Sequence, residues 1–212
     1  MEIVMTRTEE LFDLSHTLAR ELFIENEPAH TALPRIKERI VEIGKASGFP
    51  EVREGVFIAE DAIIADSATI IPPVIIGRRT EVRPGAYIRG LAIIGDGVVI
   101  GNSTEIKNAI IFDGAQLPHY NYVGDSIIGY RSHLGAGAIA SNFRLDHKSV
   151  PVNDKDGRYD SGLRKLGTLL GDGAEVGCNS VLCPGTVIGR GAIIYPLSRV
   201  IGYVGEGEKF IG

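Results

Sequence analysis

The sequence predicts a mainly β protein built as a parallel β-helix of hexapeptide repeats, with a helical cap at its N-terminus. Three observations lead to this prediction. The 212 residues include 27 glycines, no tryptophan and only 7% aromatic residues, which indicates many tight turns around an aliphatic core. Over the central part of the chain an apolar residue recurs at every sixth position, a period that neither an α-helix nor an ordinary strand produces. The first 50 residues have apolar residues at helical spacing instead.

Residues 1–52 are expected to form the helical cap. A first helix is predicted to start near Thr8. It would carry a row of leucines at helical spacing, namely Leu11, Leu14, Leu18 and Leu22. A second helix is predicted from Pro34, a favoured first-turn residue, to Gly48. Because repeat folds need terminal caps, this role is preferred to that of a separate binding module.

Residues 53–204 are assigned to the β-helix, and residues 205–212 to a C-terminal tail. Each hexapeptide would form one short side and one turn, so that stacking buries a column of apolar residues. The unbroken column is Ile58, Ile64, Ile70, Ile76, Val82, Ile88, Ile94, Ile100, Ile106 and Phe112. The period resumes at Ile128 and again from Leu170 to Val200.

The repeat is absent from residues 143–168, which are charged and rich in turn-forming residues. A loop of this length in a compact domain is usually functional or disordered. Because it directly follows the segment with the unusual polar residues, we expect a functional arm that reaches a neighbouring subunit. The alternative is a solvated excursion.

Charge and composition argue against several classes of partner. The formal net charge is −5, whereas proteins that bind nucleic acids usually carry a basic surplus. The sequence has no signal peptide and no apolar run long enough to span a membrane, so a cytoplasmic protein is expected. Cys178 and Cys183 lack the spacing of a redox or zinc motif and are expected to be free thiols.

The stretch from residue 105 to residue 142 interrupts the period and concentrates polar side chains. If one coil has eighteen residues, Arg89 and Lys107 stack at about the ~4.8 Å spacing of neighbouring strands. A phosphate group could join the two cations, although two solvated corner charges fit the spacing equally well. His119 lies at a corner of the same kind, and a carboxylate such as Glu105 could fix its tautomer so that the free nitrogen acts as a base.

Three motifs in this stretch carry a resemblance to a known family. They are E-x-K-N-A from Glu105, P-H-x-x-Y-V-G-D-S-x-I-G from Pro118, and L-G-A-G-x-x-x-x-N from Leu134. The sequence resembles the hexapeptide-repeat acyltransferases, and in particular the acetyltransferase domain of the bifunctional glucosamine-1-phosphate acetyltransferase/N-acetylglucosamine-1-phosphate uridylyltransferase enzymes and their stand-alone pyrophosphorylase-related relatives. This resemblance implies a left-handed β-helix with triangular coils, acetyl-CoA as co-substrate, and a homotrimer with its active sites between adjacent prisms.

The resemblance also implies roles for individual residues. His119 would be the general base and Glu105 would orient it. The residues implied in binding the sugar phosphate are Arg89, Lys107, Tyr122, His133, Asn142 and Lys148. Those implied in binding the cofactor are Ala136, Cys178 and Pro196. The chain departs from the family pattern at three positions: His133 replaces an asparagine, Phe143 a tyrosine, and Cys178 a small hydroxyl residue.

These features predict an enzyme that moves an acetyl group from acetyl-CoA to the amine of a phosphorylated or nucleotide-linked amino sugar, similar to glucosamine 1-phosphate, without a metal. Residues 1–57 contain no glycine-rich nucleotide loop, so nucleotidyl transfer is not expected. One alternative is a zinc enzyme on the same prism, but its H-x-x-x-x-H pair is not matched by His119, His133 and His147, which are spaced by fourteen. Another is a non-catalytic module for sugar-nucleotide binding or assembly.

Overall fold

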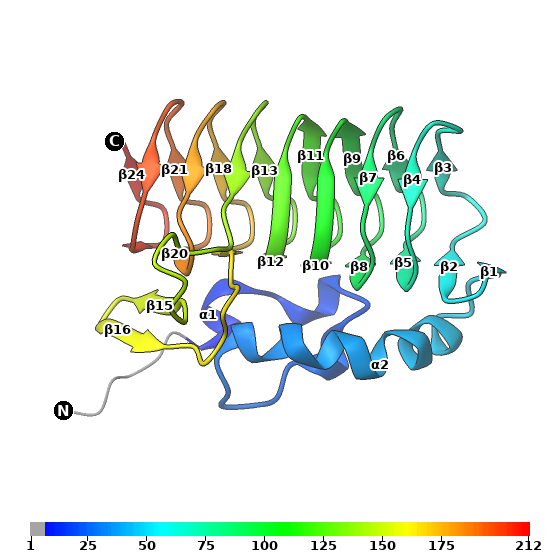
Figure 1. The fold of residues 1–212 in the computed structure, drawn as a ribbon, viewed down its shortest axis with the longest axis horizontal. Helices are drawn as coiled ribbons and strands as arrows, with labels where there is room; N and C mark the ends of the chain where they lie inside the picture. Colours follow the sequence, from blue (N-terminus) through cyan, green and yellow to red (C-terminus); the bar gives the residue numbers. More distant parts are fainter. Residues whose placement is uncertain (1–6) are drawn as a thin grey trace.

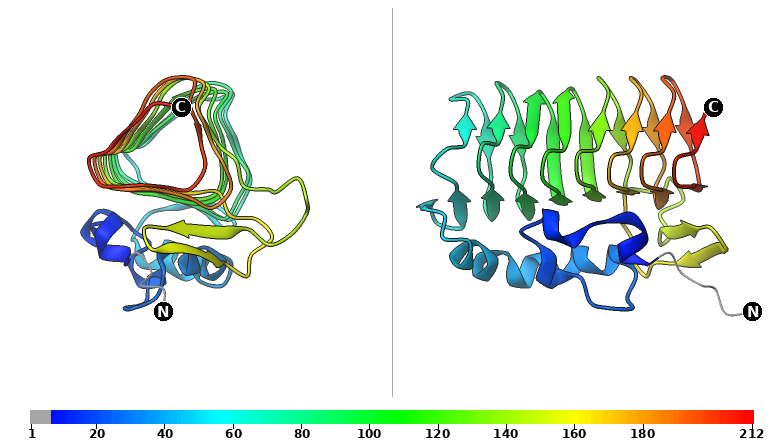
Figure 2. Two further views of the ribbon diagram at one scale, coloured as in Figure 1. Left: turned by 90° about the vertical axis from the view of Figure 1, so that its left-hand side faces the viewer. Right: turned by 180° about the vertical axis from the view of Figure 1, so that it is seen from behind.

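The computed structural model describes residues 7–212 and has the predicted form of a left-handed parallel β-helix with a cap along one side (Figure 1). Viewed along its axis, the helix is a triangular prism (Figure 2). Strands of successive coils pair in parallel, so the backbone N–H and C=O groups of one coil are satisfied by the next. No helix in the described residues is long and apolar enough to cross a membrane.

The prism has three faces, each made of one short strand per coil. The face that carries the cap, here the cap face, consists of β2 (Val56–Ile58), β5 (Val74–Ile76), β8 (Ala92–Ile94), the second halves of β10 (Glu105–Ile111) and β12 (Tyr122–Ile128), β17 (Thr168–Leu170), β20 (Thr186–Ile188) and β23 (Tyr203–Val204). The second face consists of β3 (Ile63–Ile64), β6 (Glu81–Val82), β9 (Val99–Asn102), β11 (Gln116–His119), β13 (His133–Leu134), β18 (Glu175–Val176), β21 (Ile193–Ile194) and β24 (Lys209–Phe210). The third face consists of β4 (Thr69–Ile70), β7 (Tyr87–Ile88), the first halves of β10 and β12, β14 (Ile139–Ala140), β19 (Val181–Leu182) and β22 (Arg199–Val200).

The two ends of the prism differ from simple repeats. At the N-terminal end, β1 (Glu51–Arg53) runs antiparallel to β2 and covers its free edge. At the C-terminal end, residues 205–212 were expected to form a tail, but they contain β24, which pairs with β21 in the last coil. Partly buried Phe210 packs against the core of the prism, which explains why this segment continues the repeat.

The interior of the prism is the predicted column of aliphatic side chains, with one change of register. Ile88 pairs with Ile106 after 18 residues, but Ile106 pairs with Val123 after only 17. Ile111 therefore takes the inward position that the strict period assigned to Phe112. Phe112 points out of the prism and packs under the cap, with its ring centroid 5.2 Å from that of Phe12.

The cap buries the outward side chains of the cap face. Helix α2 (Ala32–Ala46) directs Ile36, Ile40 and Ile43 onto this face, and all three are at most 5% exposed. The row beneath them consists of Phe57, Ile75, Ile93, Ile110 and Ile127, all buried. Without the cap, this row would be a continuous apolar stripe in contact with water, which is unfavourable for a soluble protein.

The first predicted helix is much shorter than its leucine row indicated. Helix α1 covers only Thr8–Leu11, and 3-10 turns follow at Leu14–His16, Arg20–Leu22 and Ala29–Thr31. Asp172 of the prism hydrogen-bonds to two backbone groups that a longer helix would use internally. Its N–H donates to the Leu11 carbonyl at 3.0 Å, and its carboxylate accepts from the Asp13 N–H at 2.7 Å. Leu11 and Leu22 are nevertheless buried, so the spacing of the leucines indicates buried positions and not a continuous helix.

The arm folds onto the cap of its own chain. Strands β15 (Pro151–Asp154) and β16 (Gly157–Asp160) form an antiparallel hairpin beside the cap helices (Figure 2). Lys155 of the hairpin lies 2.6 Å from the carboxylate of Glu10. This contact holds the arm against the N-terminal segment of the same molecule, and the expected contact of the arm with a neighbouring subunit stays a prediction.

A buried histidine lies where the cap meets the arm. His30 is 4% exposed, its ring centroid lies 6.0 Å from that of Tyr159, and its Nδ1 has no hydrogen-bond partner. Burial lowers the pKa of His30 from 6.5 to about 4, and a hydrogen bond to the backbone of Ser161 opposes this shift only partly. The imidazole is therefore neutral in the folded protein at pH 7.

This pKa predicts how stability depends on pH. The unfolded chain takes up a proton on His30 below pH 6.5, whereas the folded protein does so only near pH 4. Stability that is complete above pH 6.5 is therefore lost as the pH falls from 6.5 towards 4, by roughly 3 kcal/mol. In urea unfolding, His30→Gln should lose about that much less than the wild type over this range, because glutamine keeps a donor but does not titrate. His133→Gln, at a half-exposed site, is the control, and equal pH slopes for His30→Gln and the wild type would contradict the prediction.

Candidate functional site

Four of the residues implied in catalysis and cofactor binding lie in one column along an edge of the prism. His119, Ala136, Cys178 and Pro196 occupy equivalent positions in successive coils, at the corner between the second and third faces. The backbone hydrogen bonds that stack them are Gly137 N–H to His119 O at 3.0 Å, Asn179 N–H to Ala136 O at 2.9 Å, and Leu197 N–H to Cys178 O at 2.9 Å. We call this set the corner column. An elongated ligand along this edge would meet all four residues.

The corner that carries His119 is braced by Asn121. The backbone N–H of His119 donates to the Asn121 side-chain oxygen at 3.2 Å, and the Asn121 amide donates to the Gly135 carbonyl in the next coil at 2.8 Å. Asn121 is 2% exposed, whereas the His119 side chain is exposed at the end of β11. The imidazole is thus presented to solvent from a rigid turn.

Glu105 does not contact His119, although it was expected to orient the imidazole. Its carboxylate lies 2.7 Å from the guanidinium of Arg89 in the preceding coil, and this hydrogen bond raises the pKa of Arg89. The physical reason is register, since Glu105 stands beside β7 on the third face while His119 ends β11 on the second. Within residues 7–212 the imidazole of His119 has no hydrogen-bond partner.

Arg89 and Lys107 stack in adjacent coils, as their spacing predicted. The N–H of Arg89 donates to the Ile106 carbonyl at 2.8 Å, which sets the two cations side by side. Each cation nevertheless has its own carboxylate: Arg89 pairs with Glu105, and the Lys107 ammonium lies 3.6 Å from Asp125. An anionic ligand at Arg89 and Lys107 would have to compete with both of these ion pairs.

A buried polar network occupies the corner between the third face and the cap face. The Asp125 carboxylate, 6% exposed, accepts hydrogen bonds from the side-chain amides of Asn108, at 2.7 Å, and of Asn142. Asn142 also hydrogen-bonds to the Tyr122 hydroxyl, and burial raises the pKa of this hydroxyl, which keeps it protonated at neutral pH. With Lys107, these side chains form what we call the Asp125 network.

Because Gly124 has no side chain, the Tyr122 and Asn142 side chains of the Asp125 network can pack over it. A Cβ atom at this position would lie 2.5 Å from the Tyr122 hydroxyl and 2.6 Å from the Asn142 amide nitrogen. No side chain larger than hydrogen fits there without moving both groups. Tyr122 and Asn142, both implied in sugar binding, are therefore held together over this glycine.

Asp125 also fastens both ends of the arm. Its carbonyl accepts from the N–H of Gly167, where the arm ends, at 2.7 Å. At the start of the arm, the carbonyl of Asn142 accepts from the N–H of Leu166 at 3.0 Å. Asn108 and Asp125 have positive φ angles of 46° and 48°, at the corners where the coil is one residue short. The sequence motifs include both residues, but no role was predicted for either, and the signal that could have revealed one is the spacing of five between Ile106 and Ile111.

Two residues implied in sugar binding lie apart from the Asp125 network. His133 is on the second face, where its Nδ1 lies 2.9 Å from the carboxylate of Glu175. Lys148 is on the arm and lines a cavity with Arg144 and Tyr159. Within the described residues, no hydrogen bond joins either side chain to Asn142 or Tyr122. No group of three or more His, Cys, Asp or Glu side chains in the described part of the chain could hold a metal ion.

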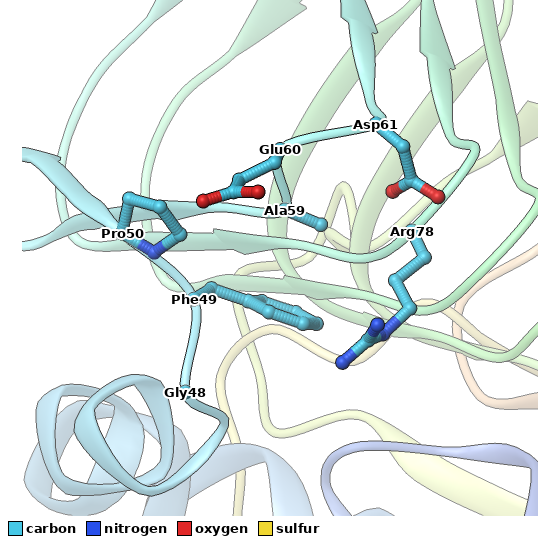
Figure 3. Close-up of a pocket in the computed structure, with 7 residues that line it drawn as sticks. All are labelled: Gly48, Phe49, Pro50, Ala59, Glu60, Asp61 and Arg78. Carbon is cyan, nitrogen blue, oxygen red and sulfur yellow. The ribbon is translucent and has the colours of Figure 1, made fainter.

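One cavity adjoins the Asp125 network and another lies far from it. The first, here the arm-base cavity, has a volume of about 530 Å³ and is lined by residues that include Asn108, Asp125 and Phe143. The second lies between the end of α2 and the first coils and has a volume of about 360 Å³ (Figure 3). It places the Arg78 guanidinium 5.6 Å from the Phe49 ring centroid and contains none of the predicted site residues.

Comparisons with known proteins agree with the resemblance seen in the sequence. Residues 70–156 match the family model described as the GMPPB C-terminal domain. A bifunctional sugar-1-phosphate nucleotidylyltransferase/acetyltransferase of Sulfurisphaera tokodaii is 40% identical over 168 residues, which are 79% of this chain and 42% of that protein. The bifunctional protein GlmU of Methanococcus maripaludis is 43% identical over 111 residues, 52% of this chain and 27% of that protein.

The chain is a hexapeptide-repeat relative of these bifunctional proteins. The predicted resemblance is thereby confirmed, although the chain covers less than half the length of either relative. Among solved structures, the acetyltransferase domain of PglB from Neisseria gonorrhoeae, in complex with acetyl coenzyme A, is similar with a TM-score of 0.34 and 18% identity, over 82% of this chain and 62% of that one.

Removal of the charge from Asp125 tests the Asp125 network. In Asp125→Asn, the new amide would face the amides of Asn108 and Asn142, and Lys107 would lose its partner. Because hydrogen bonds to a buried charged group would be lost, we expect the free energy of unfolding to fall by about 1–3 kcal/mol. Urea unfolding measures this change. Asp156→Asn, at the exposed tip of the arm hairpin, is the matched control, and equal stability of the two variants would refute the role given to Asp125.

Proposed function

We propose that the chain transfers an acetyl group from acetyl-CoA to the amine of a phosphorylated or nucleotide-linked amino sugar. The relative from Sulfurisphaera tokodaii is named as a sugar-1-phosphate nucleotidylyltransferase and acetyltransferase, which supports acyl transfer to a sugar. The observation that carries the proposal is the corner column. It aligns His119 with Ala136, Cys178 and Pro196 on one edge. Tyr122 begins the third face in the coil of His119, and its hydroxyl reaches Asn142 at the far corner of that face in the next coil.

In this proposal His119 is the general base. An amine attacks the thioester carbonyl with its lone pair, and the nitrogen must lose a proton as the new C–N bond forms. The exposed imidazole at the rigid corner takes this proton. The tetrahedral intermediate then collapses, the C–S bond breaks, and the coenzyme A thiolate leaves and is protonated. Because a thioester is already activated, the protein contributes mainly position, one base and a site for the oxyanion.

The N–H of Ala136 is the proposed oxyanion donor. In this corner the N–H groups of Gly135, Gly137 and Ala138 all have backbone acceptors, whereas that of Ala136 has none among the described residues. Proline, which has no backbone N–H, occupies the equivalent positions 84 and 196, so the coils do not need a hydrogen bond from the N–H at this position. An unused N–H beside the reacting carbonyl could stabilise the charge that develops on its oxygen.

On the acceptor side, the proposed contacts are Tyr122 and Asn142, with the phosphate at Arg89 and Lys107. The tyrosine hydroxyl and the asparagine amide are held close together, and both can hydrogen-bond to sugar hydroxyls. A phosphate at the stacked cations would replace Glu105 and Asp125 as their partner. This exchange would free the Glu105 carboxylate from Arg89 when the substrate binds.

Release of free thiol from acetyl-CoA in the presence of glucosamine 1-phosphate tests the proposal. His119→Ala should reduce turnover by about 100-fold or more, the usual contribution of a general base. Gln116→Ala, on the same strand but three residues before the corner, should retain wild-type turnover. Equal activity of His119→Ala and the wild type would exclude His119 as the base. Binding of the sugar phosphate by the wild type without any turnover would favour the non-catalytic alternative.

We further propose that the active form is a homotrimer, by analogy with the family that the sequence resembles. Light scattering coupled to size exclusion should then give three times the chain mass of 22.8 kDa. A monomeric mass for a fully active sample would contradict a site shared between prisms.

A further inference from the structure

The arm-base cavity has the chemistry of a binding site that the roles above do not use. It lies where the start of α2, the shortened corners of the prism and both ends of the arm converge. Its volume of about 530 Å³ falls within the ~300–1,000 Å³ range of small-molecule sites. Leu33, Pro34 and Leu163 give it an apolar wall, and Asn108 with Asp125 give it a polar floor.

Two adjacent cations, Arg164 and Lys165, line this cavity without a carboxylate partner. No acidic oxygen in residues 7–212 lies within 4.0 Å of either cation. Other cations near the site are already neutralised: Arg89 by Glu105, Lys107 by Asp125, and Arg144 by Asp146. An anionic ligand would displace no internal carboxylate from Arg164 or Lys165, so it would gain more here than at the paired cations.

An aromatic ring completes the cavity. Phe143 lines it at the start of the arm and forms a β-bridge with Lys165, whose ammonium lies 5.9 Å from the ring centroid. A ring, two cations and an apolar wall together suit a ligand that has both anionic groups and a flat apolar body. A bare sugar phosphate has no such body.

The cavity is contiguous with the proposed acceptor site. Asp125 belongs to its lining and also binds Asn142, and Phe143 directly follows Asn142 in the chain. A ligand whose sugar contacts Asn142 would therefore lie one residue along the chain from the cavity wall at Phe143. The end of such a ligand would meet Arg164 and Lys165.

We infer that the arm-base cavity binds the nucleoside diphosphate portion of a nucleotide-linked amino sugar, with Arg164 and Lys165 at the phosphates and Phe143 beside the base. This inference rests on the proposed function, because it chooses the nucleotide-linked acceptor over the simple sugar phosphate. The departure at Phe143, where the related bacterial enzymes have a tyrosine, then falls in a ligand-binding wall.

Calorimetric titration of the full chain with UDP, GDP, glucosamine 1-phosphate and inorganic phosphate tests the inference. At least one of the two nucleotides should bind the wild type, and the double substitution Arg164→Ala/Lys165→Ala should weaken that binding tenfold or more. The charge-retaining double substitution Arg164→Lys/Lys165→Arg should keep it within about threefold. Arg158→Ala, at an exposed cation of the same arm outside this cavity, should leave it unchanged. Circular dichroism would verify that each variant is folded.

The inference is overturned if neither nucleotide binds the wild type, if the alanine double variant binds as well as the wild type, or if inorganic phosphate binds as tightly as the nucleotide. Glucosamine 1-phosphate provides the separation from the proposed function. Wild-type acetylation of this sugar, unchanged in the alanine double variant, would leave acyl transfer standing even if the cavity bound no nucleotide.

Discussion

The buried carboxylate of Asp125 connects parts of the chain that are far apart in sequence. The carboxylate accepts hydrogen bonds from the side-chain amides of Asn108 and Asn142, and the backbone carbonyl of Asp125 accepts one from the N–H of Gly167. A buried charge of this kind is tolerated only when it is fully hydrogen-bonded, and here its partners come from the coil before it, through Lys107 and Asn108, and from the coil after it, through Asn142. The arm leaves and rejoins the prism at this point, so the proposed acceptor residues and the arm-base cavity both depend on it.

The regular part of the fold provides the other half of the proposed site. Parallel pairing repeats the same corner in each coil, and this repetition sets His119, Ala136 and Cys178 one above another. The cap stiffens the arrangement by burying the outward row of the cap face. A long thioester cofactor fits an edge that repeats, whereas a compact sugar fits the irregular corner beside it. The two substrates of the proposed reaction thus match two kinds of geometry.

The sequence predicted the elements that follow from a period and missed those that follow from tertiary contacts. The period of six found the prism and its column, but a single residue missing from a coil exchanged Phe112 for Ile111. The first helix ended early because Asp172, distant in sequence, takes its backbone hydrogen bonds. Glu105 stood near His119 in the motif, yet the register of the third face gives it to Arg89. Pairwise contacts of this kind cannot be read from spacing alone.

The coupling between Asp125 and Asn142 tests the central claim most directly. A double-mutant cycle with Asp125→Ala and Asn142→Ala, measured by urea unfolding, isolates the energy that these two side chains share. If the carboxylate holds the arm through Asn142, the two losses should differ from additivity by about 1 kcal/mol or more. Losses that add to within about 0.3 kcal/mol would mean that the arm is held by other contacts and that Asp125 does not connect it to the site.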